Sequence, residues 1–206
     1  MLRFFHLKVN MKKFFILCLV ILNYGCGHFG SKHLTIAILP LGLNQNQEYL
    51  IDEIKESIME KKEFDVVVLK DFSLPQSAWY EPRKRYHANK IILHLKKIKP
   101  DSVDYILALT SEDISITKGG KDWGIFGLGY EPGVASVVST FRLGNNKKLL
   151  TKRILKITKH ELGHNFGLPH CKNSKTCVMH SAEGSIKTVD RVHNVFCKKC
   201  QDKLSR

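Results

Sequence analysis

The stretch that decides the fold is residues 160–170, which read His-Glu-Leu-Gly-His-Asn-Phe-Gly-Leu-Pro-His. His160 and His164 are four residues apart, so on a helix they lie on one face, one turn from each other. Gly167 stands where that helix must end, because glycine enters the left-handed conformation at little cost. The chain can then turn back, and His170 can rejoin the first two histidines. The stretch therefore predicts a helix that ends beside three converging imidazoles.

Three imidazoles form a typical catalytic zinc site, because a set of three protein ligands leaves the fourth position open to water or substrate. Glu161 lies beside the expected metal and can act as a general base. The alternative is a surface helix with incidental histidines, which the combined spacing makes rare. We therefore predict that His160, His164 and His170 hold a catalytic zinc. We also predict that Glu161 activates a zinc-bound water for peptide-bond hydrolysis.

Four cysteines follow the histidines, at positions Cys171, Cys177, Cys197 and Cys200. The last two have the C-x-x-C spacing that lets two thiolates bind one tetrahedral zinc. Four thiolates close the coordination shell, so the expected site is structural. Two disulfides are the alternative, which an exported protein could form. The C-x-x-C spacing makes local pairing awkward, and the pattern favours a second zinc.

Met179 lies two residues after Cys177, inside the cysteine cluster. Metzincins place a methionine in a tight turn beneath the catalytic zinc. A lone methionine is usually core filler, but the place of this one just after His170 favours the turn.

These residues together resemble the archaemetzincin family, whose pattern is H-E-x-x-H-x-x-G-x3-C-x4-C-x-M-x17-C-x-x-C. The matching residues, in order, are His160, Glu161, His164, Gly167, Cys171, Cys177, Met179, Cys197 and Cys200. One spacing departs from the pattern, because five residues instead of four separate Cys171 from Cys177. A loop can absorb one residue at small entropic cost. Residues 105–110 and 137–143 also resemble strands of the family, and the resemblance covers about residues 34–200.

The resemblance implies a zinc peptidase with aminopeptidase-type activity on small peptides. It implies two zinc ions per chain, one catalytic and one structural. The implied fold is a single metzincin-like α/β (α+β) domain over residues 34–206. This domain would hold a mixed twisted sheet, backing helices and an active-site helix, with a cysteine zinc subdomain at residues 171–200.

The first half of the chain independently predicts an α/β layer. Apolar, β-rich runs predict buried strands at residues 34–39, 65–69 and 103–110. Apolar residues at helical spacing predict helices over residues 45–62 and about 84–98. Strands that alternate with helices at this spacing favour right-handed crossovers.

A glycine-rich section precedes the active-site helix and contains two apolar runs, residues 123–130 and 134–143. We interpret them as a loop and an outer strand pair beside the cleft. In metzincins an edge strand pairs with the main chain of the substrate. By that analogy residues 133–139 are the candidate substrate strand, and an ordinary paired strand is the equally open alternative.

The helix that carries the histidines is expected to run over residues 147–166, with Asn145 as its N-cap. No residue stands out as an additional oxyanion donor. His180 follows Met179 and could approach the site, but we expect it to be a polar surface histidine.

The amino-terminal residues 1–25 read as a signal peptide. A lysine pair precedes an apolar run at residues 14–22, which is too short to cross a bilayer but typical of a signal. Cys26 follows a glycine at the expected cleavage point, as in bacterial lipoproteins. We expect Cys26 to be lipidated, residues 26–33 to form a tether, and the protein to be anchored to the membrane of a bacterial cell envelope. A secreted or periplasmic protein is the main alternative, and an uncleaved anchor or a cytoplasmic protein is another.

Composition limits the remaining function classes. The chain has 206 residues and 43% hydrophobic residues, enough for one folded domain with a core. Its net charge is +14, and lysines and arginines are dispersed. We therefore expect a solvated basic surface and no nucleic acid partner. We also expect the protein to be a monomer that acts on a peptide or protein substrate. The alternatives are a catalytically silent zinc-binding module on the cell surface, against which Glu161 argues, and a zinc-ribbon nucleic-acid binder.

Overall fold

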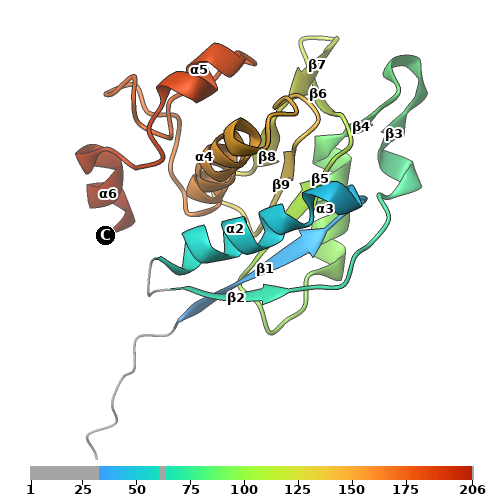
Figure 1. The fold of residues 1–206 in the computed structure, drawn as a ribbon, viewed down its shortest axis with the longest axis horizontal. Helices are drawn as coiled ribbons and strands as arrows, with labels where there is room; N and C mark the ends of the chain where they lie inside the picture. Colours follow the sequence, from blue (N-terminus) through green and yellow to red (C-terminus); the bar gives the residue numbers. More distant parts are fainter. Residues whose placement is uncertain (1–32, 61–63, 206) are drawn as a thin grey trace, which may run out of the picture. The chain divides into compact units, whose positions relative to one another are not determined.

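The chain folds around two β-sheets, and the computed structural model describes residues 33–60 and 64–205 (Figure 1). The larger sheet has the strand order β2-β1-β5-β9-β8. All neighbouring strands in it are parallel except β8 and β9, which are antiparallel. Its strands are β1 (Leu34–Pro40), β2 (Phe64–Val68), β5 (Tyr105–Thr110), β8 (Gly127–Gly129) and β9 (Ala135–Ser139). The predicted mixed sheet is therefore confirmed, as are the expected strands near residues 34–39, 65–69 and 103–110.

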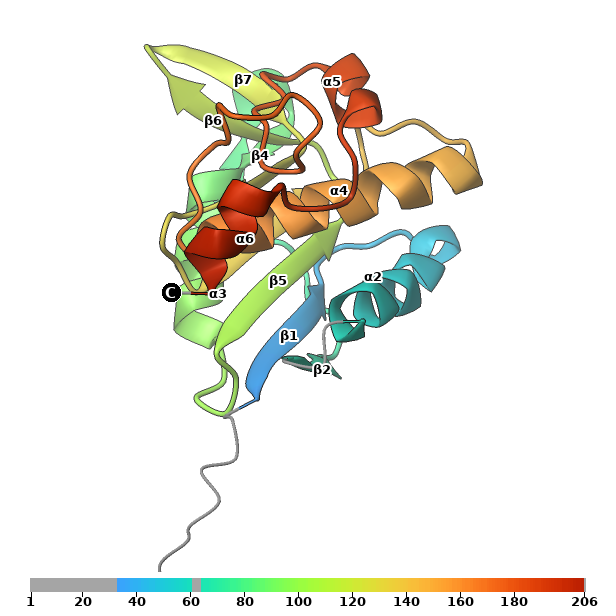
Figure 2. The same cartoon turned by 90° about the vertical axis from the view of Figure 1, so that its left-hand side faces the viewer.

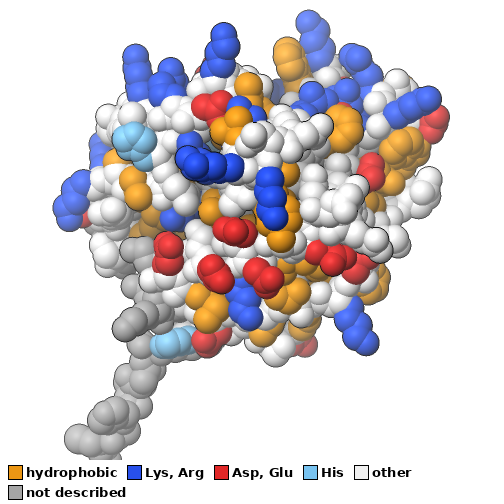
Figure 3. Space-filling model, in the orientation of Figure 1, with side chains coloured by type: hydrophobic (Ala, Val, Ile, Leu, Met, Phe, Trp, Pro, Cys, Tyr) orange, Lys and Arg blue, Asp and Glu red, His pale blue; other side chains and the backbone are white. Residues whose placement is uncertain are grey.

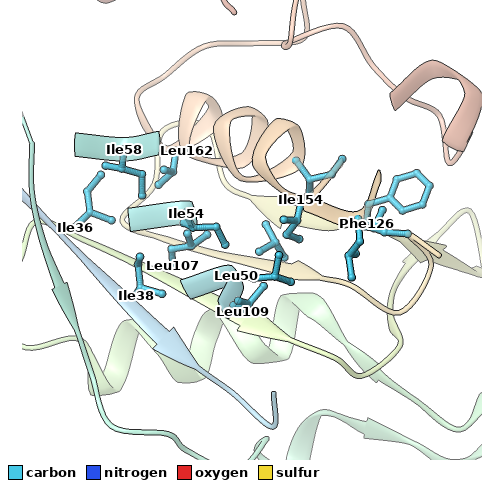
Figure 4. Close-up of a cluster of buried hydrophobic side chains, with 14 of the residues drawn as sticks. Ile36, Ile38, Leu50, Ile54, Ile58, Leu107, Leu109, Phe126, Ile154 and Leu162 are labelled. Atoms are coloured by element: carbon cyan, nitrogen blue, oxygen red, sulfur yellow. The ribbon is translucent and has the colours of Figure 1, made fainter. Parts of the chain in front are cut away.

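Helices cover both faces of this sheet. Helices α2 (Tyr49–Met59) and α4 (Lys147–Asn165) lie on one face, and α3 (Ala88–Ile98) lies on the other (Figure 2). Side chains alternate along β1, so Ile36 and Ile38 join the core beneath α2 and α4, as Figure 4 shows. The intervening Ala37 and Leu39 pack into the second core, with residues of α3. Burial on both faces explains why β1 reads as a continuous apolar run.

Both helices expected in the first half are present but shorter than predicted. Residues 45–47 form the separate 3-10 helix η2 (Gln45–Gln47), which precedes α2. Residues 85–87 belong to a strand, where Tyr86 pairs with Trp79 on one side and with Ile114 on the other. Pairing with two neighbouring strands overrides the helical spacing there.

The smaller sheet has the order β3-β4-β6-β7. Its strands are β3 (Trp79–Tyr80), β4 (Arg85–His87), β6 (Ile114–Lys118) and β7 (Lys121–Ile125), with the 3-10 helices η3 (Gln76–Ala78) and η4 (Glu81–Arg83) before β3 and after it. Gly119 and Gly120 join β6 to β7 with φ values of 59° and 72°. Two residues with positive φ form the tight turn that suits a hairpin. The two apolar runs of the glycine-rich section do not form this hairpin. They contain β8 and β9, which pair antiparallel in the larger sheet.

The N-cap of α4 is Asn146, one residue later than predicted. The side chain of Asn146 accepts a hydrogen bond from the amide of Leu149 at 3.0 Å. Because an N-cap side chain reaches the third residue of its helix, Asn145 lies one position too early. The helix ends at Asn165 with Phe166 as its C-cap, and Gly167 follows in the left-handed conformation predicted for it, at φ 85°.

The chain after α4 contains two short helices, α5 (Ile186–Arg191) and α6 (Lys198–Leu204). The guanidinium group of Arg153 in α4 donates two hydrogen bonds to the carboxylate of Asp190 in α5, at 2.7 and 2.6 Å. Lys156 adds hydrogen bonds to the carbonyls of Val189 and Asp190. The carboxyl-terminal segment is therefore fastened along the active-site helix.

The features predicted for the amino terminus lie outside the described residues: the signal peptide at residues 1–25, the lipidated Cys26, and all of the tether except residue 33. Among the helices of residues 33–60 and 64–205, none combines the length and the apolar character needed to span a membrane.

Charged side chains of both signs lie on the face of the molecule that Figure 3 shows. Lysine and arginine side chains lie mainly along the top and the edges of this view, and most acidic side chains lie across its middle and lower part.

Candidate active site

The last turns of α4 carry His160 and His164 on one face, and the chain after Gly167 returns His170 to them. The ring centroids of His160 and His164 are 4.7 Å apart, and the His170 ring lies 5.2 and 4.8 Å from them. The three potential ligand nitrogens all lie within 4.8 Å of one another. The structure therefore brings together the three histidines that the sequence spacing selects.

Hydrogen bonds fix the tautomers of two of these histidines. Nδ1 of His160 lies 2.7 Å from the carbonyl of Val178, and Nδ1 of His164 lies 2.8 Å from the carbonyl of Leu168. Because a carbonyl only accepts, each Nδ1 carries the hydrogen, and each Nε2 presents a lone pair.

The two Nε2 atoms are 3.1 Å apart. Two nitrogens bound to one zinc at about 2.0–2.1 Å in a tetrahedron would be about 3.4 Å apart. Two lone pairs that face each other repel unless a cation lies between them. The donor set and its orientation therefore fit a zinc ion.

The three histidines are held in the neutral form that a metal requires. Burial lowers the pKa of His160 to about 3. Burial also lowers the pKa of His164 and of His170. A proton therefore competes weakly with a metal for these nitrogens.

Glu161 is buried between α4 and the edge strand β8. Burial raises the pKa of its carboxyl group to about 8, and a hydrogen bond from the backbone of Gly129 opposes this shift. A Cβ atom at Gly127 would lie 2.7 Å from Cγ of Glu161, and one at Gly129 would lie 2.5 Å from its carbonyl oxygen. Only glycine at these positions lets the strand approach the helix so closely. The sequence analysis treated both glycines only as part of a glycine-rich section and did not predict this role.

The edge strand on the side of the histidines is β8, so residues 133–139 are not the substrate strand, and the alternative of an ordinary paired strand is confirmed. Within those residues β9 lies between β5 and β8, and all its residues are buried. Both hydrogen-bonding edges of β9 are therefore used within the sheet. The three residues of β8 lie within the apolar run 123–130, which the sequence analysis included in the loop and outer strand pair, but only the sheet order reveals that β8 forms the edge.

Met179 occupies the turn predicted for it. The amide of His180 donates to the carbonyl of Cys177 at 2.9 Å, which closes the turn around Met179. The Met179 side chain is fully buried, and its sulfur would lie 2.4 Å from a Cβ atom at Gly163, between the two helical histidines. The methionine thus packs directly against the helix turn that carries His160 and His164.

His180 lies beside the histidine cluster, which corrects its assignment as a surface residue. Its side chain is half-buried, and its Nδ1 lies 3.3 Å from the carbonyl of Cys171. The charge of a protonated His180 lowers the pKa of both His160 and His170. The turn around Met179 brings it there, and its exposure could not be read from the sequence.

The four cysteines form a second cluster, in which all sulfur atoms lie within 4.8 Å of one another. Cys197 lies 3.7 Å from Cys171 and 3.7 Å from Cys200, and Cys177 lies 3.8 Å from Cys200. Four sulfurs about 2.3 Å from one zinc are about 3.8 Å apart at the corners of a tetrahedron. These four cysteines are free thiols, so their arrangement fits a closed zinc site and does not support disulfides.

The extra residue between Cys171 and Cys177 is taken up in a turn. The amide of Thr176 donates to the hydroxyl of Ser174 at 3.3 Å, and that of Cys177 donates to the carbonyl of Ser174 at 3.4 Å. Burial raises the pKa of Cys171, but backbone hydrogen bonds from Asn173 and Ser174 and side-chain hydrogen bonds from Cys197 and Cys200 together outweigh it and lower the pKa to about 7. The departure from the family spacing therefore leaves the cluster intact.

A loop beside the histidines was missed by sequence reasoning. Asn165, next to His164, is buried, and its amide nitrogen donates to the carbonyls of Tyr130 and Ala135 at 3.2 and 3.1 Å. This loop carries Glu131, whose Oε2 lies 3.9 Å from Nδ1 of His164. The only feature of the sequence that could have indicated this loop was the amide side chain of Asn165 at the buried end of an amphipathic helix.

The chain matches the model of peptidase family M54 over residues 35–206. It is 35% identical to archaemetzincin from Methanopyrus kandleri over 158 residues, which cover 76% of this chain and 87% of that protein. It is 32% identical to archaemetzincin from Saccharolobus solfataricus over 177 residues, which cover 82% of this chain and 93% of that protein.

Two solved structures are similar to this fold. The crystal structure of archaemetzincin from Methanopyrus kandleri matches with a TM-score of 0.74 and 32% identity, covering 86% of this chain and 98% of that one. The structure of archaemetzincin from Archaeoglobus fulgidus, complexed with malonate, matches with a TM-score of 0.71 and 28% identity, covering 82% and 99%.

Proposed function

Because the chain belongs to peptidase family M54, the archaemetzincins, and is a zinc metallopeptidase, we propose that it hydrolyses small peptides from their amino ends with Glu161 as the general base. The observation that carries the site is the pair of Nε2 lone pairs that face each other 3.1 Å apart, with His170 beside them. No comparable observation favours the silent module or the nucleic-acid binder.

His160, His164 and His170 would hold the catalytic zinc. When bound there, zinc lowers the pKa of water and polarises a carbonyl group. The carbonyls of Val178 and Leu168 orient two of the three rings, which keeps their Nε2 atoms directed at a common point.

Glu161 supplies the proton transfers in this proposal. Its carboxylate takes a proton from the attacking water and returns it to the leaving amine. Its burial and its contact with Gly127 and Gly129 restrict the carboxylate to one position. A base fixed in this way spends no energy on reorganisation during the reaction.

The outer edge of β8, which no described strand pairs with, would bind the substrate main chain. An extended peptide can add to a free strand edge through backbone hydrogen bonds. The strand lies against Glu161, so a peptide bound there passes the base.

A digest of a peptide library tests this function. The zinc-loaded protein should remove residues one at a time from free amino ends, and a chelator should abolish the activity until zinc is restored. Mass spectrometry of the products reads the cleavage points. Cleavage at internal bonds alone would contradict the aminopeptidase part of the proposal and leave the zinc peptidase assignment standing.

We further propose that Cys26 carries lipid and anchors the protein in a bacterial cell envelope. Support comes from the lysine pair, the apolar run at residues 14–22, and the glycine before Cys26. Cys26→Ser should release soluble protein or block processing, because an acylated anchor gains about 0.8 kcal/mol per buried CH₂ group. Cell fractionation and the intact mass of the amino-terminal fragment measure the outcome. A soluble wild-type protein that begins at another, unmodified residue would overturn the proposal.

A further inference from the structure

The carboxylate of Glu131 faces the histidine cluster without a hydrogen-bond partner among the described residues. Its Oε2 lies 3.9 Å from Nδ1 of His164, and 40% of the side chain is exposed. That distance is too long for a hydrogen bond, and Nδ1 already donates to the carbonyl of Leu168 at 2.8 Å. Glu131 therefore does not orient His164, and its negative charge is available to a ligand in the site.

The position of Glu131 is fixed by the residue next to His164. Asn165 binds the carbonyls of Tyr130 and Ala135, and its own carbonyl accepts a hydrogen bond from the amide of Gly133 at 3.3 Å. These three contacts bracket Glu131 on both sides. The loop therefore keeps a fixed position relative to the helix that carries His164. A residue that selects substrates needs such a fixed position.

Two acids lie near the histidine cluster. Oε2 of Glu131 lies 3.9 Å from Nδ1 of His164, and the charges of Glu131 and Glu183 both act on His170.

The direction of β8 relates Glu131 to a bound peptide. The strand runs from Gly127 to Gly129, and the chain continues directly through Tyr130 to Glu131. A peptide that adds antiparallel to an edge strand has its amino end beside the carboxyl end of that strand. The peptide's first residue would therefore lie at the end of β8 where Glu131 stands.

The covalent structure of an amino-terminal residue also places its α-amino group close to the bond that is cleaved. In an amino-terminal residue the α-nitrogen is two bonds from the carbonyl carbon that is cleaved. A carboxylate beside the histidines is therefore within reach of this ammonium group when the carbonyl is at the metal site.

We propose that Glu131 binds the α-ammonium group of the substrate and thereby selects peptides with a free amino terminus. The inference rests on the proposed aminopeptidase function and names the residue that would determine it. A charged hydrogen bond at this position favours the ammonium form, and acetylation of the amine removes both the charge and the fit.

Binding and turnover of one tripeptide in free and N-acetylated form test the inference. In turnover, Glu131→Gln should reduce the preference for the free form about tenfold, since partial exposure weakens the ion pair. Glu183→Gln is the matched control, an acid removed from the same vicinity, and should keep the preference. Zinc content should be equal in all three proteins.

Equilibrium binding supplies a readout that does not depend on turnover. Fluorescence anisotropy of the carboxyl-terminally labelled tripeptides is measured on Glu161→Gln protein with and without Glu131→Gln. The added substitution should weaken binding of the free tripeptide about tenfold and leave the affinity for the acetylated tripeptide unchanged.

The outcomes separate this inference from the function on which it rests. If the wild type binds and cleaves both tripeptides equally, the aminopeptidase proposal fails, and the inference fails with it. If the wild type prefers the free amine and Glu131→Gln keeps the full preference, Glu131 is not the anchor, and the aminopeptidase proposal stands.

Discussion

Glu161→Gln is expected to lower kcat/KM by at least about 100-fold while the protein keeps its zinc. Glutamine has nearly the same shape as glutamate and fits the space beside Gly127 and Gly129. It cannot accept the proton of the attacking water, so the loss falls on the transition state. Steady-state kinetics and elemental analysis on the same preparation measure the two quantities.

The matched control is Glu53→Gln on the exposed face of α2, far along the chain from the histidines. It should leave kcat/KM near the wild-type value, because surface substitutions of this kind have small effects. Near-normal turnover in zinc-loaded Glu161→Gln protein would remove Glu161 as the base. A loss of zinc in that variant would instead show that the glutamate supports the metal site.

The arrangement of the three histidines could be predicted because it is set locally. The residues concerned lie within residues 160–170, where the helix period places His160 above His164 and the left-handed Gly167 turns the chain. Half of the cysteine cluster was predictable for a similar reason, since Cys197 is the N-cap of α6 and Cys200 lies three residues later in its first turn. Short-range geometry decides the arrangement of the three histidines and of this cysteine pair.

Strand order could not be predicted in the same way, because it depends on contacts between distant segments. The sequence of β9 is that of an apolar strand whether it lies at the edge or in the middle, and only its pairing with both β5 and β8 decides the question. The residues at 85–87 carry a helical spacing but pair with β3 and β6. No sequence pattern marks Glu131 as part of the site, because its position depends on the buried contacts of Asn165 with the loop.

The histidine cluster and the cysteine cluster share one segment of backbone, and we expect this to link their stabilities. His170 and Cys171 are adjacent in the chain, and the amide of Cys171 donates to the carbonyl of Met179 at 2.8 Å. Met179 packs beneath the helix that carries His160. A displacement of Cys171 is therefore transmitted to His170 through the peptide bond between them. It is transmitted to the turn at Met179 through one backbone hydrogen bond.

Cys197→Ser is accordingly expected to release one of two zinc ions and to destabilise the protein by at least about 3 kcal/mol. Cys197 lies 3.7 Å from both Cys171 and Cys200, and Cys177 accepts its backbone amide at 3.3 Å. A hydroxyl group is a poor zinc ligand, so the remaining three thiols would no longer form a closed shell. Elemental analysis and urea denaturation measure the two effects.

Cys197→His is the informative control, because an imidazole can replace a thiolate in a tetrahedral zinc site. Cys197 is the least buried of the four cysteines, which leaves room for the larger side chain. We expect this variant to keep two zinc ions and to unfold at a higher urea concentration than Cys197→Ser. Two zinc ions and wild-type stability in Cys197→Ser would contradict a structural site at the cysteines. One zinc ion in the wild type, with no free thiols under denaturing, non-reducing conditions, would show that the cysteines form disulfides. The assignment of the catalytic site to the three histidines would still stand.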